Sequence, residues 1–337
     1  MIESKIPSSI KIWIFWINVL LFAAIAGFRS GIDMPDYATY QGLYFEVLDS
    51  KNVNYFIEPS FQLIALISNF LAPREPIMLF IIYAFLGVFL KNYLILKFPI
   101  PIFLAQLVYL SNFFIVHELI QIRAGIATGF IVLTLLNLVR HEKKMALLFL
   151  GIATFFHFSS FVFFFLFFFN FSSFKVRNIF GLLILSYLLY YLKLDPITLG
   201  LNFFIENFVF VKSAYLDTAR AEEFATNVIG IFILTKIIII LFFLTSSANI
   251  SITRNIYFNL SFVSFVIGVC AYIGLARFPE IAVRISYTLM FFEVFLIPFI
   301  ASIFKPRYYA NLFVIVFSWT FFMANVQLTS YFSYNIA

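Results

Sequence analysis

The chain has 337 residues, of which 63% are hydrophobic, 21% aromatic and only 11% charged, whereas about 25% of residues are charged in an ordinary soluble domain. This composition excludes such a domain, and apolar runs from end to end predict a single polytopic membrane domain over residues 1–337. The net charge of +6 gathers in short loops between these runs, which indicates membrane topology and not nucleic-acid binding. One cysteine, and histidines without H-x-x-x-H spacing, predict neither a disulfide nor a structural metal site.

The predicted membrane spans follow the apolar runs in chain order. They cover residues 10–28, 76–92, 98–116, 124–139, 145–174, 178–192, 228–244, 257–275, 285–302 and 309–326. The run 145–174 is too long for one ordinary span, and its polar break at residues 157–160 predicts two short tilted helices that meet there. We therefore expect an all-α integral membrane protein with about eleven transmembrane helices (10–12).

The segment 57–72 is better interpreted as re-entrant or interfacial than as a span. If it crossed the membrane, the basic loop 140–144 would lie on the same side as the acidic loop 33–58, against the positive-inside rule. With the amino terminus in the cytoplasm, Lys91 falls in an inner loop, and residues 29–57 and 193–227 form outer loops. The outer side then keeps several arginines that need a functional reason: Arg29, Arg123, Arg220, Arg277 and Arg284.

The first outer loop combines charged and aromatic residues. Arg29 and Asp33 are suited to bind a polar ligand, and Tyr37, Tyr40 and Tyr44 recur at helical spacing. Such a face of tyrosines can stack on sugar rings. The alternative is an interfacial helix among lipid headgroups, stabilised by an ion pair between Arg29 and Asp33.

Arg123 lies at the mouth of a predicted helix, in the segment HELIQIRAGIATG. A guanidinium in this position can hold a phosphate through two hydrogen bonds. The alternative is an arginine that extends to the membrane interface without binding a ligand. Gly125 and Gly129 form a G-x-x-x-G pattern, which is typical of helix packing.

A second candidate anion site lies in residues 276–294. Pro279 suits a first helical position, which puts Arg277 just before the helix and Arg284 and Tyr287 on one face of it. Free amides and the helix dipole at such a start favour an anion. The alternative is an ion pair between Glu280 and Arg284 on the helix surface.

Two further charged residues lie deep in predicted spans. Lys236 and Glu293 are each about 12 Å below the outer end of their helix, by a rise of about 1.5 Å per residue, so they can pair. A structural ion pair is the favoured interpretation, and a proton or ion relay is the alternative.

His157 stands within the phenylalanine-rich stretch TFFHFSSFVFFFLFFF, beside Ser159 and Ser160. Burial of an imidazole without a partner is unfavourable, so the residue is either satisfied locally or kept for chemistry. On the outer side it could accept a proton from a sugar hydroxyl or bind a phosphate. The alternative is that it only caps a broken helix.

Short motifs in a fixed order resemble the EpsG-like branch of the Wzy-type polysaccharide polymerases. They are R-S-G-I-D-M-P-D-Y-A-T-Y at Arg29 to Tyr40, E-P-S-F at Glu58 to Phe61, I-R-A-G-I-A at Ile122 to Ala127, F-H-F-S-S at Phe156 to Ser160 and R-I-S-Y at Arg284 to Tyr287. The resemblance spans most of the chain. The long outer loop 193–227 contains no such motif.

The resemblance implies a metal-independent glycosyltransferase of GT-C type, without a cofactor, that has a cavity at the outer face of the bacterial inner membrane. It would transfer a growing glycan from undecaprenyl diphosphate to a lipid-linked repeat unit. Arg123, Arg277 and Arg284 would neutralise the diphosphate. His157 would be the base, with Asp33 or Glu58 as the competitor. Substrate contacts are expected from the remaining arginines and tyrosines: Arg29, Tyr37, Tyr40, Arg220 and Tyr287.

Other activities remain open at this stage. An O-antigen ligase would use the same donor with a different acceptor, and a polytopic O-acetyltransferase would also need a membrane histidine. A flippase or transporter of lipid-linked glycans would use Lys236 and Glu293 as its coupling pair. As partners we expect undecaprenyl-diphosphate-linked oligosaccharides, the lipid bilayer and a chain-length regulator protein, and no nucleic acid.

Overall fold

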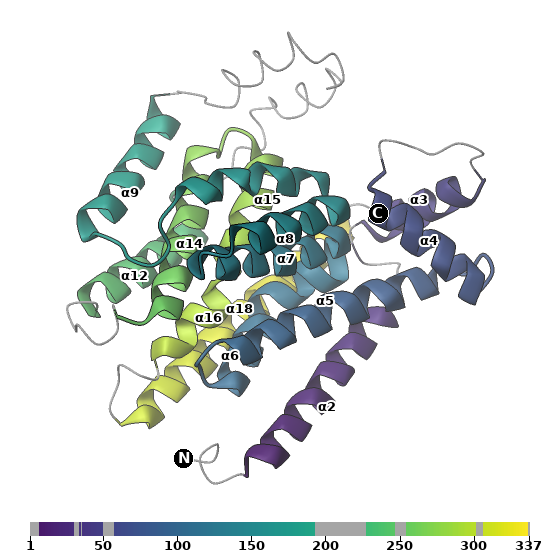
Figure 1. Ribbon diagram of the computed structural model, residues 1–337, viewed down its shortest axis with the longest axis horizontal. Coiled ribbons are helices and arrows are strands. Elements are labelled where there is room, and N and C mark those ends of the chain that lie inside the picture. The colour runs from purple at the N-terminus through teal and green to yellow at the C-terminus, as the bar shows by residue number, and fades with distance from the viewer. Residues whose placement is uncertain are drawn as a thin grey trace. The chain divides into compact units, whose positions relative to one another are not determined.

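The structure is a computed structural model that describes residues 7–29, 34, 36–49, 57–192, 227–246, 254–300 and 306–335. In these residues all regular secondary structure is helical (Figure 1). The chain divides into two compact units, of which the first comprises residues 1–169 and 294–337 and the second residues 170–293. Asp33, Arg220 and most of the outer loop 193–227 lie outside the described residues.

Seven helical segments within the described ranges are long and apolar enough to cross a membrane. They are Ser9–Gly27, Ile77–Lys97, Ile102–Ile120, Ile122–Val139, Ile256–Gly274, Ile281–Phe299 and Arg307–Val326. Each coincides with a predicted span, so a polytopic all-α membrane protein is confirmed. The other predicted spans coincide with shorter helices, and the count of about eleven stays a prediction.

Among the described residues, most of the helices belong to the first unit. In chain order they are α2 (Ser8–Gly27), α3 (Tyr37–Asp49), α4 (Pro59–Leu71), α5 (Ile77–Lys97), α6 (Ile102–Tyr109), the π-helix η1 (Leu110–Ile120), α7 (Ile122–Val139), α8 (Lys143–Phe156), the 3₁₀-helix η2 (Phe158–Phe168), η4 (Ile297–Phe299) and α18 (Arg307–Asn335). The short helix α16 (Glu293–Leu296) contains the boundary between the units.

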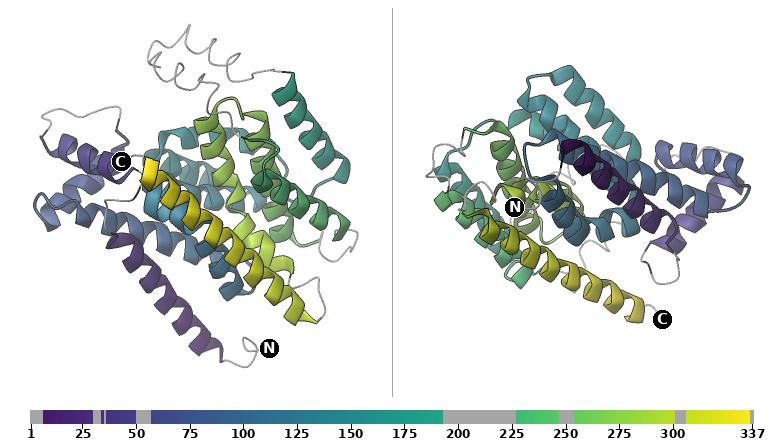
Figure 2. Two further views of the ribbon diagram at one scale, coloured as in Figure 1. Left: turned by 180° about the vertical axis from the view of Figure 1, so that it is seen from behind. Right: turned by 90° about the horizontal axis from the view of Figure 1, so that it is seen from below.

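Helix α5 organises the first unit, because it packs against α2, α4 and α7 (Figure 1). Helix α7 packs in turn against α8, and α18 lies along α6 and η1 (Figure 2). The predicted packing role of the G-x-x-x-G pattern is confirmed. A Cβ atom on Gly125 would lie 2.3 Å from the carbonyl oxygen of His117, and one on Gly129 would lie 2.5 Å from Cδ2 of Leu90.

Two irregular segments of the first unit position polar residues. The predicted break in the long apolar run is confirmed, because α8 ends at Phe156 and His157 adopts an extended conformation (φ −153°, ψ 112°) before η2 begins. Helix α4 has 13 residues, a length of about 20 Å. This is shorter than the hydrocarbon core of about 30 Å, as a re-entrant or interfacial helix requires.

The second unit contains α9 (Val176–Tyr191), α12 (Ile231–Ser246), α14 (Ile256–Gly274) and α15 (Pro279–Met290). Helix α14 packs against the other three. Nζ of Lys236 lies 2.6 Å from Oε2 of Glu293, and both side chains are buried, so the predicted ion pair is confirmed. The proline at the start of α15 also occupies the predicted first helical position.

Candidate active site

Glu58 is the residue immediately before α4, and its side chain does not accept a hydrogen bond from the first amides of that helix. Its carbonyl oxygen accepts a hydrogen bond from the amide of Phe61 at 2.9 Å, and Pro59 begins the helix without an N–H to satisfy. The carboxylate makes no capping bond to its own helix. Because α4 packs against α5 and α8, this carboxylate is carried to a buried position in the first unit.

Arg123, the second residue of α7, pairs with Glu58. Its Nη1 donates to Oε2 of the carboxylate. The guanidinium carbon also lies 5.2 Å from the centre of the Tyr40 ring and 5.6 Å from that of Phe61, which are cation–π distances. Nε of Arg123 is buried without a hydrogen-bond partner in the described part of the chain. Nε is therefore the nitrogen of this guanidinium that is left to bind a ligand.

His157 contacts the other oxygen of the same carboxylate. Its Nδ1 lies 2.9 Å from Oε1 of Glu58. The extended conformation at the end of α8 turns this side chain away from the regular helical path. Its Nε2 is buried and has no hydrogen-bond partner among the residues that the structure describes. Glu58 thus bridges Arg123 and His157, and the sequence had offered these three residues only as parts of separate motifs.

The charge state of Glu58 defines what the histidine can do. Burial alone would raise the pKa of Glu58, but the hydrogen bond from His157 and the positive charge of Arg123 outweigh it and hold that pKa below its usual value. The carboxylate is then ionised at neutral pH and can only accept hydrogen bonds. Nδ1 of His157 must therefore carry the proton of this hydrogen bond, and Nε2 is the ring nitrogen that the bond to Glu58 leaves unused.

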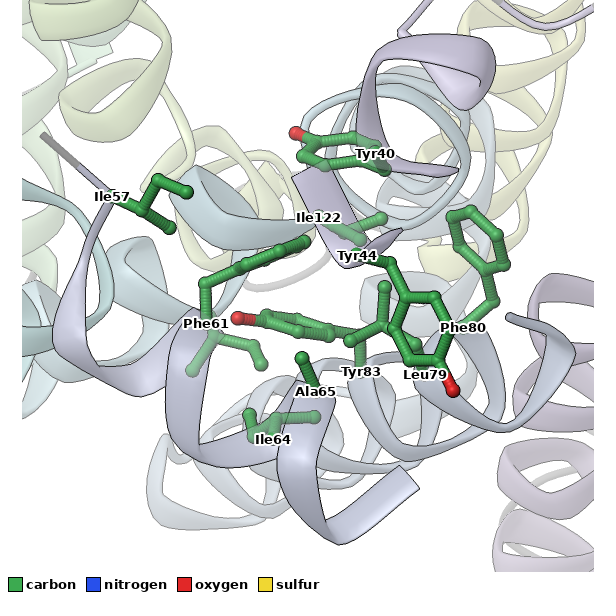
Figure 3. Packing of buried hydrophobic residues seen from close by; sticks show 11 residues of the cluster. Tyr40, Tyr44, Ile57, Phe61, Ile64, Ala65, Leu79, Phe80, Tyr83 and Ile122 are labelled. Carbon is green, nitrogen blue, oxygen red and sulfur yellow. The ribbon is translucent and has the colours of Figure 1, made fainter. Parts of the chain in front are cut away.

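The rings of Tyr40 and Phe61 beside Arg123 belong to a buried hydrophobic cluster, which Figure 3 shows with Tyr44, Phe80 and Tyr83. Tyr40 and Tyr44 are buried, and the ring of Tyr37 stacks on that of Phe80 with centroids 4.3 Å apart. The predicted helical face of tyrosines is therefore present, but it packs largely on protein rings. Its role in sugar binding stays a prediction.

Arg29 is a buried cation that follows α2 in the same unit. Its Nη1 donates to the carbonyl oxygens of Ala26 and Glu118, both at 2.9 Å, and its guanidinium lies 4.5 Å from the centre of the Phe80 ring. Burial lowers the pKa of Arg29 to about 10. No carboxylate pairs with it within the described ranges, and its predicted partner Asp33 lies outside them.

A second buried carboxylate, Glu118, lies near the end of η1. Its Oε1 accepts hydrogen bonds from Nζ of Lys91 and from the hydroxyl of Tyr109, the latter at 2.9 Å. The prediction of Lys91 in an inner loop is therefore wrong, because α5 continues past it to Lys97 and its side chain is fully buried. The helix continues because apolar residues follow Lys91, and Glu118 supplies the opposite charge that burial requires.

The remaining predicted site residues belong to the second unit. Arg277 is exposed just before α15, and Arg284 and Tyr287 are half-buried on that helix. The ring of Tyr287 stacks on Phe232, with centroids 5.9 Å apart. A shared site of these residues with Arg123 stays a prediction. Within the described ranges, no group of three or more histidine, cysteine, aspartate or glutamate residues could hold a metal ion.

Comparison with known protein families identifies one family that matches this chain. The EpsG family matches residues 12–336, nearly the whole sequence. The chain belongs to the EpsG family. As an EpsG-family protein it is related to the Wzy-like polymerases, which agrees with the resemblance seen in the sequence motifs. Neither the curated proteins nor the solved structures gave a match to it.

Sequence reasoning on this EpsG-family chain found the residues of the site but not their connections. Glu58 and His157 were competing candidates for one role, whereas they are hydrogen-bonded partners. The pair of Lys91 and Glu118 was missed. One signal could have found it, because each is a charged residue next to long apolar runs, and such residues are seldom buried unpaired.

Proposed function

We propose that this EpsG-family chain is a polysaccharide polymerase at the outer face of the bacterial inner membrane. It transfers a growing glycan from undecaprenyl diphosphate to a hydroxyl of the next lipid-linked repeat unit. The observation that supports this most is the bridge of Glu58 between Arg123 and His157, which leaves Nε2 of His157 without a partner. This is the arrangement of a positioned general base.

In the proposed reaction His157 acts on the acceptor. Its Nε2 accepts the proton of the attacking hydroxyl while the hydroxyl oxygen bonds to the anomeric carbon of the donor glycan. The bond between that carbon and the diphosphate oxygen breaks, and its electron pair leaves with the diphosphate. Glu58 keeps its charge throughout, orients the imidazole through Nδ1 and stabilises the imidazolium that forms.

Arginines take the charge that develops on the leaving diphosphate. Arg123 has a buried Nε without a partner in the described residues, beside the carboxylate that holds its other edge. A guanidinium so fixed stabilises a developing anion without reorganisation. We propose Arg277 and Arg284 as further diphosphate ligands, with Arg29, Arg220 and the tyrosines Tyr37, Tyr40 and Tyr287 contacting sugars. The GT-C architecture, independence from metals and a chain-length regulator as partner belong to the same proposal.

One observation favours a second candidate function, the transport of a lipid-linked glycan. The ion pair between Lys236 and Glu293 is buried in a membrane segment, and Oε1 of Glu293 has no hydrogen-bond partner among the described residues. Such a pair can couple transport to proton movement. A ligase would share the donor chemistry of the polymerase and differ in its acceptor.

The test is a reconstitution of the purified protein in liposomes with lipid-linked repeat units. We expect wild type to produce a ladder of longer glycans that persists in EDTA, and Arg123→Ala to lose it while remaining folded. Lys236→Met should keep the ladder, per folded molecule. A wild-type protein that moves the lipid across the bilayer without lengthening the glycan, and that loses this movement in Lys236→Met, would contradict the polymerase and support the transporter.

A further inference from the structure

An apolar groove of about 390 Å³ runs between helices of the first unit. Its walls come from α5, α7 and α8, and they consist of Phe85, Leu86, Phe89, Leu90, Ile126, Phe130 and Phe156. Phe85 and Leu86 are exposed on the outside of the protein, and Ile126 is buried at the inner wall. The groove is therefore open on one side and lined by hydrocarbon along its length.

Two lining residues of this groove are close in the chain to Arg123 and His157. Ile126 and Phe130 are three and seven positions after Arg123, which places them on the same face of α7. At 1.5 Å per residue they lie about 4.5 and 10.5 Å further along the helix. Phe156 immediately precedes His157, and its ring stacks on that of Phe130 with centroids 5.7 Å apart. The apolar groove thus starts about one helical turn along α7 from Arg123.

We infer that the groove holds the prenyl chain of the donor lipid and not that of the acceptor; this rests on the proposed polymerase function. In the donor, only the diphosphate separates the reacting anomeric carbon from the first prenyl unit. In the acceptor, a whole repeat unit and the diphosphate separate the reacting hydroxyl from the prenyl chain. A groove that begins one helical turn from Arg123 matches the short separation.

Charge complementarity supports the same occupant. The donor is an anion at one end and a hydrocarbon along the rest, and the site offers a guanidinium about one helical turn from a groove with aromatic and aliphatic walls. A second apolar groove, in the other unit, provides a contrast. It is lined by Phe180, Leu183, Ile184, Tyr187, Leu188, Tyr191, Ile237 and Leu241, and none of Glu58, Arg123 and His157 belongs to that unit.

Photocrosslinking tests the assignment without requiring turnover. Phe85 and, as a matched control in the second groove, Phe180 are each replaced by p-benzoylphenylalanine; the native side chains are 38% and 43% exposed. The donor-only probe is a lipid-linked repeat unit with its acceptor hydroxyl blocked. The acceptor-only probe joins the repeat unit to the prenyl chain through an uncharged linker, so it lacks the diphosphate that Arg123 would hold in the donor position. We expect the Phe85 variant to crosslink the donor-only probe about tenfold more than the acceptor-only probe, and the control to show no preference.

A kinetic experiment gives an independent readout. Leu86→Trp fills the groove, and Ile184→Trp makes the same change on the exposed lining of the second groove. Loss of contact with about two methylene groups predicts a KM for the undecaprenyl donor raised about tenfold in Leu86→Trp, with unchanged kcat. A donor with only two prenyl units should show the same KM in wild type and in this variant.

The outcomes separate this inference from the proposed function. If wild type lengthens glycans but the Phe85 variant crosslinks both probes equally, or crosslinks only phospholipid, the donor groove is wrong and the polymerase stands. If wild type does not lengthen glycans with any repeat unit tried, the polymerase is wrong and the donor assignment falls with it.

Discussion

In the described part of the first unit, two buried carboxylates differ in how completely the protein satisfies them. Glu118 is enclosed with Lys91, and their side chains are 1% and 0% exposed. Glu58 binds Arg123 and His157, which are 20% and 14% exposed and retain nitrogen atoms without a partner in the described residues. The cluster of Glu118 and Lys91 is thus closed to further ligands, whereas the cluster of Glu58, Arg123 and His157 is incomplete because it retains unpaired nitrogen atoms in the described residues. An incomplete cluster can accept a ligand, whereas a closed one stabilises the fold.

We expect the largest effect on activity when Glu58, which bridges Arg123 and His157, loses its charge. Glu58→Gln removes the charge that fixes the Nδ1 proton and leaves Arg123 without its carboxylate. We expect kcat for polymerisation to fall about 10²- to 10⁴-fold. Turnover per folded molecule is the measurement, with size-exclusion behaviour as the control. A variant that keeps at least half of the wild-type kcat would remove Glu58 from the mechanism.

Breaking the closed cluster should act on stability instead. Lys91→Met leaves the carboxylate of Glu118 buried without its cation, and loss of one partner of such a pair destabilises by about 3–5 kcal/mol. Replacement of both residues by methionine should recover most of this loss. Thermal unfolding in detergent measures both. If kcat per folded molecule fell a hundredfold in Lys91→Met while stability was unchanged, the contrast between the two clusters would not hold.

A smaller effect tests the close packing of Glu118. A Cβ atom on Gly87 would lie 2.2 Å from Oε2 of that residue, so Gly87→Ala forces a shift that we expect to destabilise by about 1–3 kcal/mol. Gly151→Ala in α8 is the matched control, because no atom lies within 4 Å of the added Cβ. It should be neutral or stabilise by up to about 1 kcal/mol. Equal melting temperatures for the two variants would contradict this packing.

The smallest effect is the pH dependence of stability through Glu58. Its pKa in the folded protein lies below the ordinary value of 4.5, because the bond from His157 and the charge of Arg123 outweigh burial. The folded state then binds fewer protons than the unfolded state, so the stabilisation is present above pH 4.5 and disappears as the pH falls through the lowered pKa. Wild type should lose stability relative to Glu58→Gln below pH 4.5. A constant difference from pH 7 to pH 3.5 would contradict the lowered pKa.

Much of the fold could be predicted from the sequence, because hydrophobic length identifies spans. Each of the seven long helices coincides with a predicted span, and the break at His157 follows from one polar interruption of an apolar run. The bounds were less accurate. The predicted span 76–92 ends before α5 does at Lys97, and Lys91, which was expected in an inner loop, is buried inside the protein.

The candidate site was only partly predictable. Glu58, Arg123 and His157 each stood out as polar residues next to apolar sequence, but local patterns do not report contacts between residues far apart in the chain. The hydrogen bond between Glu58 and His157 joins residues 99 positions apart. For the same reason the sequence could not show that the ring of Tyr40 lies against the guanidinium of Arg123.

The most direct test of the central claim is the turnover of His157→Ala beside that of His141→Ala, with purified protein and defined lipid-linked donor and acceptor. His141 is an exposed histidine between α7 and α8, so its loss should leave kcat unchanged. His157→Ala should keep the donor KM within about threefold and lower kcat by about 10²- to 10⁴-fold. A His157→Ala protein that polymerises at the rate of His141→Ala would show that the Glu58, Arg123 and His157 cluster is not the reacting centre.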